Sequence, residues 1–479
     1  MRLLEKLSRN VHRSSNAAAL ALVRSAIILA ALGGATSVPA SATAGAVVDI
    51  AAGGHHTCAL MATGNVKCWG YNLYGQLGLD DNVSRGRAPG QMGSALPEAR
   101  FVGHGPIIQM ALGLYHTCVL TSDGTVGCWG YNAHGELGLG HTSNIGDQPN
   151  EMLPMSLNIP WGGHNTNIVK IAAGWYHTCS LNLFNQVRCW GWNNHGQLGS
   201  GDVLNYGDTT FDGTTTPTSS FPFLGSGRRV IDITASAYST CALLDNQQVK
   251  CWGYNEQGQL GLGLGSADRG GHPGEMGDNL PALNLLGSPA TMQPVRLLGG
   301  RLHHCAVFDD QLRAKCWGYN GMGQLGIGTT QIHGRNPGEM GAGLPFITTH
   351  PVQSFDLRSK GDHSCVLGRY HDPAFPGVNS IQCWGDNTFG QLGTGDLHRR
   401  GDAPGHDPVD VPFAGAQASG APHSVVRIAV GAFHTCALLE NNVVNCWGYN
   451  GNGELGLGDA RNRGGVRTDL GDGMKPVDL

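Results

Sequence analysis

Short apolar runs recur along the chain after residue 44, each followed by a β-prone hairpin and a glycine-rich polar segment. Runs of this length that end in small residues are typical of single buried β-strands. Six of them are Val47 to Ala52, Ile107 to Leu112, Ile168 to Ala173, Val230 to Ala235, Val295 to Leu298 and Val425 to Val430. The pattern predicts an all-β protein built from short strands and tight turns.

The hairpin is clearest in the stretch GLYHTCVLTSDGTVGCWGYNAHGELGLG, which begins at Gly113. The runs Thr117 to Thr121 and Thr125 to Trp129 flank a Ser-Asp-Gly loop, with glycine at the position that needs a positive φ. Counting outward from this loop places Cys118 directly opposite Cys128. Opposed residues in antiparallel strands have Cα atoms about 4.5–5.5 Å apart, which is within or near disulfide range. The spacing therefore predicts a disulfide across the hairpin.

Close copies of this stretch occur seven times and use every cysteine of the chain. The predicted disulfides join Cys58 with Cys68, Cys118 with Cys128, Cys179 with Cys189, Cys241 with Cys251, Cys305 with Cys316, Cys365 with Cys383, and Cys436 with Cys446. In the third and seventh copies, Asn185 and Asn442 replace the loop glycine, since asparagine tolerates positive φ better than most residues. A Trp-Gly pair, an asparagine and the motif G-Q/E-L-G follow each second cysteine.

The repeat interval of about 60 residues predicts one array rather than several unrelated domains. The expected repeats are 45–104, 105–165, 166–227, 228–291, 292–352, 353–422 and 423–479. Four strand-like pieces can be counted in each repeat, the fourth from segments such as Pro294-Val295 or the terminal Pro476 to Leu479. Seven units of four strands predict a seven-bladed β-propeller, in which radial closure protects the strand edges. Whether strands from both termini share the last blade is left open.

Residues 1–44 have the order of a secretory signal peptide. Basic residues come first, an apolar run from Ala26 to Leu32 follows, and small residues surround Ala42 and Ala44, where cleavage is expected. The apolar run is shorter than the ~20 residues that a membrane span needs. We therefore expect a propeller of residues 45–479, secreted or periplasmic or on the cell surface, with no membrane insertion after signal removal.

Charge and cysteine usage agree with that compartment. Fourteen cysteines in seven even pairs, with no C-x-x-C motif, suit an oxidising environment. The leader carries five basic residues and one acid, so the remainder has 25 basic against 34 acidic residues, a net charge near −9. Such an acidic chain lacks the electrostatic footprint for nucleic acid. We expect a monomer.

The repeated pattern A-A-G-x-x-H-T-C-A-L followed by V-x-C-W-G-x-N-x-x-G-Q-L-G is similar to the regulator of chromosome condensation repeat family. The resemblance covers essentially all of residues 45–479 and implies a seven-bladed propeller. It implies little about activity, because propellers of this kind host unrelated functions.

Three side chains recur in nearly every copy. Histidine stands two residues before the first cysteine in six repeats, with Ser239 in the fourth, and asparagine and tryptophan recur in all seven. A ring of imidazoles could bind a metal or an anion, but seven-fold placement spreads the rings too far apart to share an ion. The pattern favours one structural hydrogen bond per blade for the histidine, a turn tie for the asparagine, and inter-blade packing for the tryptophan.

Departures from the repeat are the better guide to function. A shared P-G-Q/E-M-G core enlarges the loop after G-Q-L-G in three repeats, and could form a binding face or simply pack over its own blade. The sixth hairpin is lengthened from Arg369 to Asn379. This loop is the candidate partner-binding site, through Arg369, Tyr370, His371, Asp372 and Phe375.

No catalytic motif is present, and no cofactor or metal is expected. The sequence favours a secreted, non-catalytic recognition or scaffold protein that binds a protein or a surface glycan through propeller-face loops. One alternative is an extracellular polysaccharide-active enzyme, which would bring carboxylates together at the central mouth. Another is a secreted inhibitor of an exported enzyme, which would show a flat, aromatic-rich patch on one face.

Overall fold

The structure is a computed structural model that describes residues 45–479 apart from residues 100, 102–104, 153–166, 209–219, 288–291, 310–312, 348–351, 371–378 and 414–422. These residues form one compact unit. The expected leader, residues 1–44, lies outside the described residues. No helix among the described residues is long and apolar enough to cross a membrane.

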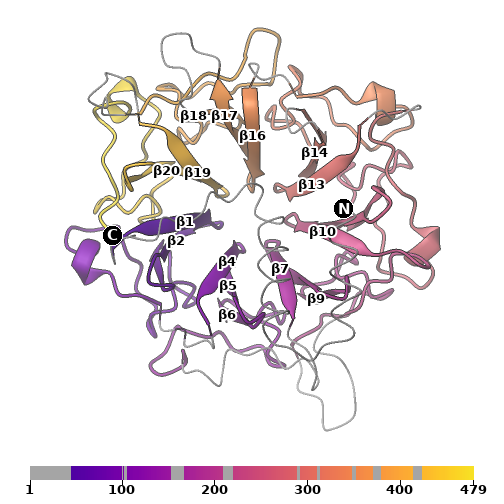
Figure 1. Ribbon diagram of the computed structural model, residues 1–479, viewed down its shortest axis with the longest axis horizontal. Coiled ribbons are helices and arrows are strands. Elements are labelled where there is room, and N and C mark those ends of the chain that lie inside the picture. The colour runs from indigo at the N-terminus through magenta and orange to yellow at the C-terminus, as the bar shows by residue number, and fades with distance from the viewer. Residues whose placement is uncertain are drawn as a thin grey trace, which may run out of the picture. The chain divides into compact units, whose positions relative to one another are not determined.

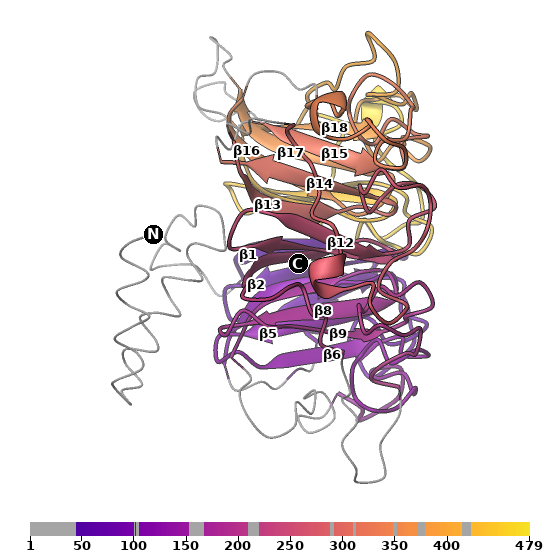
Figure 2. The ribbon, with the colours of Figure 1, turned by 90° about the vertical axis from the view of Figure 1, so that its right-hand side faces the viewer.

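Seven three-stranded antiparallel sheets surround a common centre, as predicted for a seven-bladed propeller (Figure 1). Viewed from the side, the sheets of neighbouring blades lie one beside the next (Figure 2). The strands of the first four blades are β1 Val47–Ala52, β2 His56–Met61 and β3 Val66–Gly70; β4 Ile107–Leu112, β5 His116–Thr121 and β6 Val126–Gly130; β7 Ile168–Ala173, β8 His177–Asn182 and β9 Val187–Gly191; β10 Val230–Ala235, β11 Ser239–Leu244 and β12 Val249–Gly253. Those of the last three are β13 Pro294–Gly299, β14 His303–Phe308 and β15 Ala314–Gly318; β16 Val352–Ser359, β17 His363–Tyr370 and β18 Asn379–Gly385; β19 Val425–Val430, β20 His434–Leu439 and β21 Val444–Gly448.

The hairpin register is the predicted one. Cys118 pairs with Cys128 in the ladder of β5 and β6, and the Thr121 N–H donates to the Thr125 carbonyl across the loop. The loop asparagines Asn185 and Asn442 have positive φ as expected.

Each blade contains the predicted disulfide between its middle and outer strands. The bonds are Cys58 with Cys68, Cys118 with Cys128, Cys179 with Cys189, Cys241 with Cys251, Cys305 with Cys316, Cys365 with Cys383, and Cys436 with Cys446. The Cα atoms of the second pair are 4.1 Å apart, somewhat closer than the separation expected for opposed residues. No cysteine among the described residues is free.

The predicted fourth strand is reduced to single bridges. In the third, sixth and seventh blades the outer strand pairs with Ser220, Asp410 and Pro476 respectively. Pro294-Val295 instead begins the inner strand β13, so that prediction is wrong. The three strands of every blade are consecutive in sequence, and Pro476 pairs with Asn445 of β21 in its own blade. No strand of the described residues is exchanged between the two ends.

The repeated side chains join each blade to the next. The His56 Nε2–H donates to Thr117 Oγ1 of the second blade (2.8 Å), and that hydroxyl donates to the Gln76 carbonyl (2.9 Å). The same carbonyl accepts from Trp129 Nε1 (3.0 Å). Every blade interface repeats the tryptophan bond, including the closing one, where Trp69 donates to the Glu454 carbonyl (2.9 Å). All seven indoles are fully buried.

Burial keeps the repeated imidazoles neutral. It lowers the pKa of His116, His177, His303 and His363 to about 3 and that of His434 to about 4. Their Nδ1 atoms have no hydrogen-bond partner among the described residues, and Nε2 faces a hydroxyl of the next blade. The structural interpretation of this histidine column is confirmed.

The repeated asparagines and the enlarged loops are also structural. Asn72 Oδ1 accepts the Leu77 N–H (2.9 Å), and its amide donates to the Asp81 carbonyl, which fixes the turn. The enlarged loops end in the short 3-10 helices η1 Gly93–Ala95, η2 Gly277–Asn279 and η3 Gly341–Gly343, and a fourth, η4, spans Arg467–Asp469. Leu96 and its counterparts in the fourth and fifth repeats are buried. These loops pack between their own blade and the preceding one: Met92 and Leu96 of the first repeat share a core with Leu455 and Val477 of the seventh.

Candidate functional site

One face of the propeller carries a continuous belt of partly exposed rings. Three repeat positions supply them: the residue before the repeated histidine, the residue after Trp-Gly, and the residue directly before G-Q/E-L-G. Because inner strands end, middle strands begin and outer strands end at the same sheet edge, these positions lie on one side of the ring of blades. We call this belt the aromatic face: Phe389, Phe433, Tyr449, His55, Tyr71, Tyr74, Tyr115, Tyr131, His134, Tyr176, Trp192, His195, Tyr238 and Tyr254.

Ring contacts connect the aromatic face from the sixth blade, through the seventh and first, to the fourth. Centroid separations run from 4.6 Å between His195 and Tyr254 to 6.3 Å between Phe433 and Tyr449, and most pairs meet edge to face. Aromatic pairs at such separations add about 0.5–1.5 kcal/mol each beyond their area burial. The face is therefore a rigid, preorganised surface with phenol hydroxyls and imidazoles among apolar rings.

Burial changes the acid–base properties of this face. It raises the pKa of Tyr254 to about 12, aided by a hydrogen bond to Glu256, and raises the pKa of Tyr115 and Tyr176 as well. Beneath the rings, burial raises the pKa of Glu136 to about 8, so this carboxyl is largely protonated at neutral pH. Glu136 occupies the glutamine column of G-Q-L-G and, like those glutamines, accepts an N–H from the residue two before it. Because burial raises their pKa values, these tyrosines of the aromatic face are neutral hydrogen-bonding groups.

The belt is interrupted between the fifth and sixth blades. Leu302 and Asp362 stand there in the column before the repeated histidine, which has an aromatic ring in the other five blades, and Met322 precedes G-Q-L-G in the fifth blade. The Arg301 guanidinium pairs with Asp362 (2.6 Å) and lies over the Trp175 and Tyr319 rings. This charged gap breaks the symmetry of an otherwise uniform face.

The centre of the propeller is lined by a second repeat column, at the third position of six inner strands and at the equivalent Asp356 of β16. Its residues bridge neighbouring inner strands and thereby cover edges that would otherwise be unpaired. Lys170 pairs with Asp232, Arg296 with Asp356 (2.7 Å), and Arg427 with Asp49 (4.0 Å), while Gln109 bonds the N–H and carbonyl of Ile171.

These pairings bear on the enzyme alternative. Asp49, Asp232 and Asp356 occupy equivalent positions rather than separate loops, and each is paired with a basic residue. Burial alone would raise the pKa of Asp356, but Arg358 and Arg296 lower it below its ordinary value. The carboxylates at the centre therefore have basic partners, although burial raises the pKa of Asp49 in spite of Arg358 and Arg427.

The candidate loop falls largely outside the described residues. Arg369 and Tyr370 end β17, where Arg369 pairs with Asn379, whereas His371, Asp372 and Phe375 lie outside the described residues. The prediction that this loop binds a partner stays a prediction. No group of three or more metal-ligating side chains occurs among the described residues.

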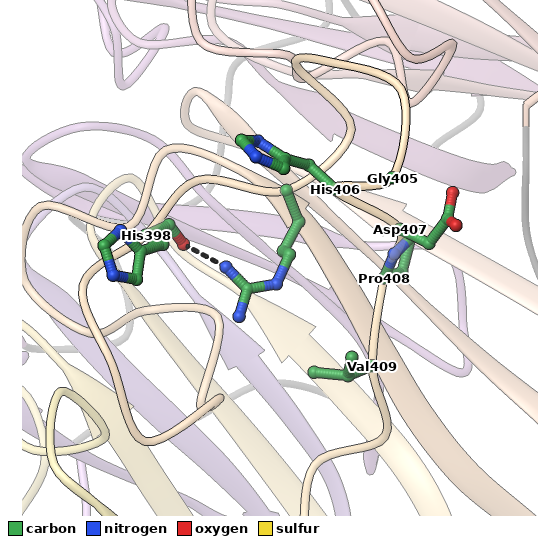
Figure 3. Close-up of a pocket in the computed structure, with 7 residues that line it drawn as sticks. His398, Gly405, His406, Asp407, Pro408 and Val409 are labelled. Carbon is green, nitrogen blue, oxygen red and sulfur yellow. Dashed lines mark hydrogen bonds between the residues drawn. The ribbon is translucent and has the colours of Figure 1, made fainter.

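A pocket of about 540 Å³ lies in the segment after β18, and its lining is drawn in Figure 3. Arg400 donates to the His398 carbonyl (3.0 Å) and pairs with Asp396 (2.7 Å), as Arg463 pairs with Asp459 in the next blade. His406 is paired with Asp402 (2.8 Å). The Arg400–Asp396 pair repeats a structural column, and His406 is engaged by Asp402, so the pocket is a weaker candidate than the aromatic face.

Sequence reasoning missed both the aromatic face and the charges at the centre. The signal was available in a comparison of the copies column by column, which shows rings in the same columns of consecutive repeats. The aromatic columns cannot be recognised from a single copy of the repeat, because no copy is unusual by itself.

The fold and its most prominent surface define a disulfide-stapled seven-bladed propeller that presents an aromatic face. The chain belongs to the RCC1-like domain family, which matches residues 90–468, and residues 47–76 match a regulator of chromosome condensation (RCC1) repeat.

Curated relatives include the ultraviolet-B receptor UVR8 of Arabidopsis thaliana, 28% identical over 419 residues, which cover 87% of this chain and 80% of that protein. The probable E3 ubiquitin-protein ligase HERC4 of Homo sapiens is 31% identical over 218 residues, 45% of this chain and 18% of HERC4. The chain thus corresponds to a small part of that ligase.

Solved structures share the fold. Human WBSCR16 gives a TM-score of 0.60 at 19% identity, with 86% of this chain and 94% of that chain covered. Yeast RCC1 (Prp20), bound to Kap60, gives 0.56 at 19% identity, covering 81% and 78%. These likenesses establish the propeller fold.

Proposed function

We propose that this protein is a secreted recognition scaffold that binds a protein partner through the aromatic face. The observation that carries the proposal is the connected run of partly exposed rings over six of the seven blades, from Phe389 of the sixth through the seventh and first to the fourth. Tyrosine and tryptophan dominate the energetics of protein interfaces because they bury large areas at little entropic cost. A single exposed ring is normal on a protein surface and does not indicate a binding site. A contiguous exposed apolar patch does indicate one.

Rigidity supports the same role. Each ring lies one or two residues from a residue of the inter-blade hydrogen-bond system, so little conformational entropy remains to be lost on binding. A protein partner is favoured over a sugar chain by the extent of the face, since specific protein interfaces bury about 800 Å² on each side. Yeast RCC1 (Prp20), whose structure shares this fold, is bound to another protein, Kap60.

Secretion belongs to the proposal too. Seven disulfides that close within their own blades suit an extracellular protein. The expected signal peptide of residues 1–44 would bring the propeller there.

A second candidate, an inhibitor of an exported enzyme, is favoured by the same observation, because an aromatic patch on one face is what that hypothesis predicted. The two candidates differ in the consequence of binding. An inhibitor must lower the activity of the enzyme that it binds.

The test uses the purified secreted protein and variants of the face. Partners are captured from native supernatant and envelope fractions, identified, purified, and measured against wild type, Tyr131→Ala and Trp192→Ala by calorimetry. Phe184→Ala is the matched control, because Phe184 is 56% exposed in the β8–β9 hairpin loop at the opposite sheet edge. We expect each face variant to weaken binding at least tenfold, about 1.4 kcal/mol, and the control to bind as wild type does.

Equal binding by all four proteins would overturn the proposal. Capture that survives proteolysis of the envelope fraction but not periodate oxidation would assign a glycan instead. If the partner is an enzyme, its turnover with and without the propeller distinguishes the scaffold from the inhibitor.

A further inference from the structure

Blade six places a cation where the other blades have almost no side chain. At the position three residues before the repeated histidine, five blades have glycine and the fourth has Ser236, whereas the sixth has Lys360. Ser236 is engaged locally, with its hydroxyl 2.7 Å from that of Ser239. Lys360 is therefore the one long side chain at this repeat position.

Lys360 crosses the centre of the propeller. Its Nζ donates to the carbonyl of Ala173, the last residue of β7 in the third blade. The third and sixth blades are not neighbours, and β7 and β16 lie on opposite sides of the centre in Figure 1. A side chain that starts in one and bonds to the other must pass through the middle of the ring of blades.

The charge around the centre is positive although the protein is acidic. Among the described inner-strand residues and Lys360, five cations (Lys170, Arg296, Arg358, Lys360 and Arg427) face three carboxylates (Asp49, Asp232 and Asp356), an excess of two. Arg358 is held by Asp356 (2.9 Å), which raises the pKa of its guanidinium. Lys360 has no acidic partner among the described residues, so one excess charge is localised on its ammonium.

The ammonium also has donors that no side chain or backbone group of the described residues is seen to accept. It carries three N–H groups, and Ala173 accepts one of them. Desolvation lowers the pKa of Lys360 to about 7, the response expected of a cation with no counter-ion. The charged and titratable groups that face it are the imidazoles of His56, His116 and His177, which are neutral when buried.

We propose that the centre of the propeller is a binding site for a single carboxylate group, held by the Lys360 ammonium. A monoanion matches one localised positive charge. At this repeat position the other blades have glycine or the locally bonded Ser236, so no second charged side chain competes for the anion. The carboxylate belongs either to a free small acid or to the end of a peptide chain. The site does not depend on the aromatic face, so it stands or falls apart from the proposed function.

The test exploits the scarcity of lysine, since only six lysines follow residue 44. Lysine labelled with ¹³C at Cε gives one NMR signal each, and Lys360→Met assigns the relevant one. Acetate is added at constant ionic strength against chloride, at pH 6.5. We expect saturable movement of the Lys360 signal with acetate and little with chloride, together with an upward shift of the pH at which that signal titrates.

Binding is measured separately from the broadening of ¹³C-acetate. Lys67→Met is the matched control, because Lys67 also donates to a backbone carbonyl, that of Gly93 (3.1 Å), far from the centre. Lys360→Gly restores the residue of five other blades and guards against a folding defect. We expect the Lys67 variant to bind acetate as wild type does, and both Lys360 variants to bind at least tenfold more weakly.

Acetylated diglycine with a free carboxyl group, compared with its amide, probes the chain-end source. Binding of the acid form over the amide supports a peptide terminus, and binding of acetate alone supports a free acid. Equal responses of wild type and the Lys360 variants, or of acetate and chloride, would overturn the carboxylate site.

Discussion

The interface between the fourth and fifth blades exchanges the roles of the two hydrogen-bonding side chains, and this exchange can be tested by reversing it. Elsewhere a histidine of one blade meets a hydroxyl of the next. Here Ser239 replaces the histidine and His304 replaces the hydroxyl residue, and Ser239 Oγ lies 2.8 Å from His304 Nε2. In the five blades that have glycine at the position of Ser236, a Cβ there would crowd the imidazole, to 2.1 Å from Cε1 of His116 in the second. Ser236, Ser239 and His304 thus form one compensated set.

His304→Thr and Ser239→His should each lower the unfolding free energy when made alone. His304→Thr removes a fully buried ring and its hydrogen bond, and we expect a loss of roughly 2–3 kcal/mol of unfolding free energy. Ser239→His places an imidazole against Ser236 and against the His304 ring. We expect this crowding to lower the unfolding free energy by roughly 1–3 kcal/mol. The triple variant Ser236→Gly, Ser239→His, His304→Thr recreates the arrangement of the other interfaces, so it should lie within about 1 kcal/mol of wild type.

The assay is guanidinium unfolding with disulfides intact, followed by fluorescence of the buried tryptophans. Slopes are compared along with midpoints, because a changed slope means that the unfolding transition itself has changed. Non-additivity of at least about 2 kcal/mol between the single and triple variants supports the reasoning. A triple variant as unstable as the sum of its parts would refute it.

Three more predictions concern the disulfides, the pH dependence of stability and export. Replacing Cys118 and Cys128 by serine should cost about 3 kcal/mol, and replacing Cys365 and Cys383 only slightly more, because loop-closure entropy grows slowly with loop length; unfolding midpoints of the two variants decide this. Stability should fall as pH drops below about 6.5 toward 4, since the unfolded histidines take up protons there while the buried ones, with their lowered pKa values, do not; chemical unfolding at several pH values measures it, and a flat profile would contradict the neutral imidazoles. Export through a bacterial secretion pathway should yield a mature chain that begins after Ala42 or Ala44, and mass spectrometry of the exported protein would expose any other start.

Repetition is what made the fold predictable. Seven aligned copies identify the strands and turns more securely than any one copy does. The pairing of Cys118 opposite Cys128 followed from counting residues outward from one loop. The failures occurred where a copy departs from the repeat. The inner strand β16 was not predicted, because Asp356 and Arg358 interrupt its apolar run. In the fourth hairpin, Gln247 adopts a positive φ that its side chain does not favour.

The surface was harder to predict because its meaning is collective. Tyr131 alone is an ordinary partly exposed tyrosine, and only its contacts with Tyr74 and Tyr176 in the neighbouring blades make it part of the aromatic face. Similarly, Lys360 in sequence is one lysine in a polar stretch. Its bond to Ala173 joins residues 187 positions apart, and no local pattern contains that information.

Departures from the repeat can be separated by whether another departure compensates for them. Ser239 in place of histidine is matched across the blade interface by His304 in place of threonine, so the hydrogen bond is kept and the change is structurally neutral. Lys360 in place of glycine has no such match, because no acidic residue on the described part of the facing strands pairs with it and its side chain leaves its own blade. A desolvated cation without a counter-ion is a cost that stability alone does not explain. In a repeat array, such a position is where a ligand should be sought first.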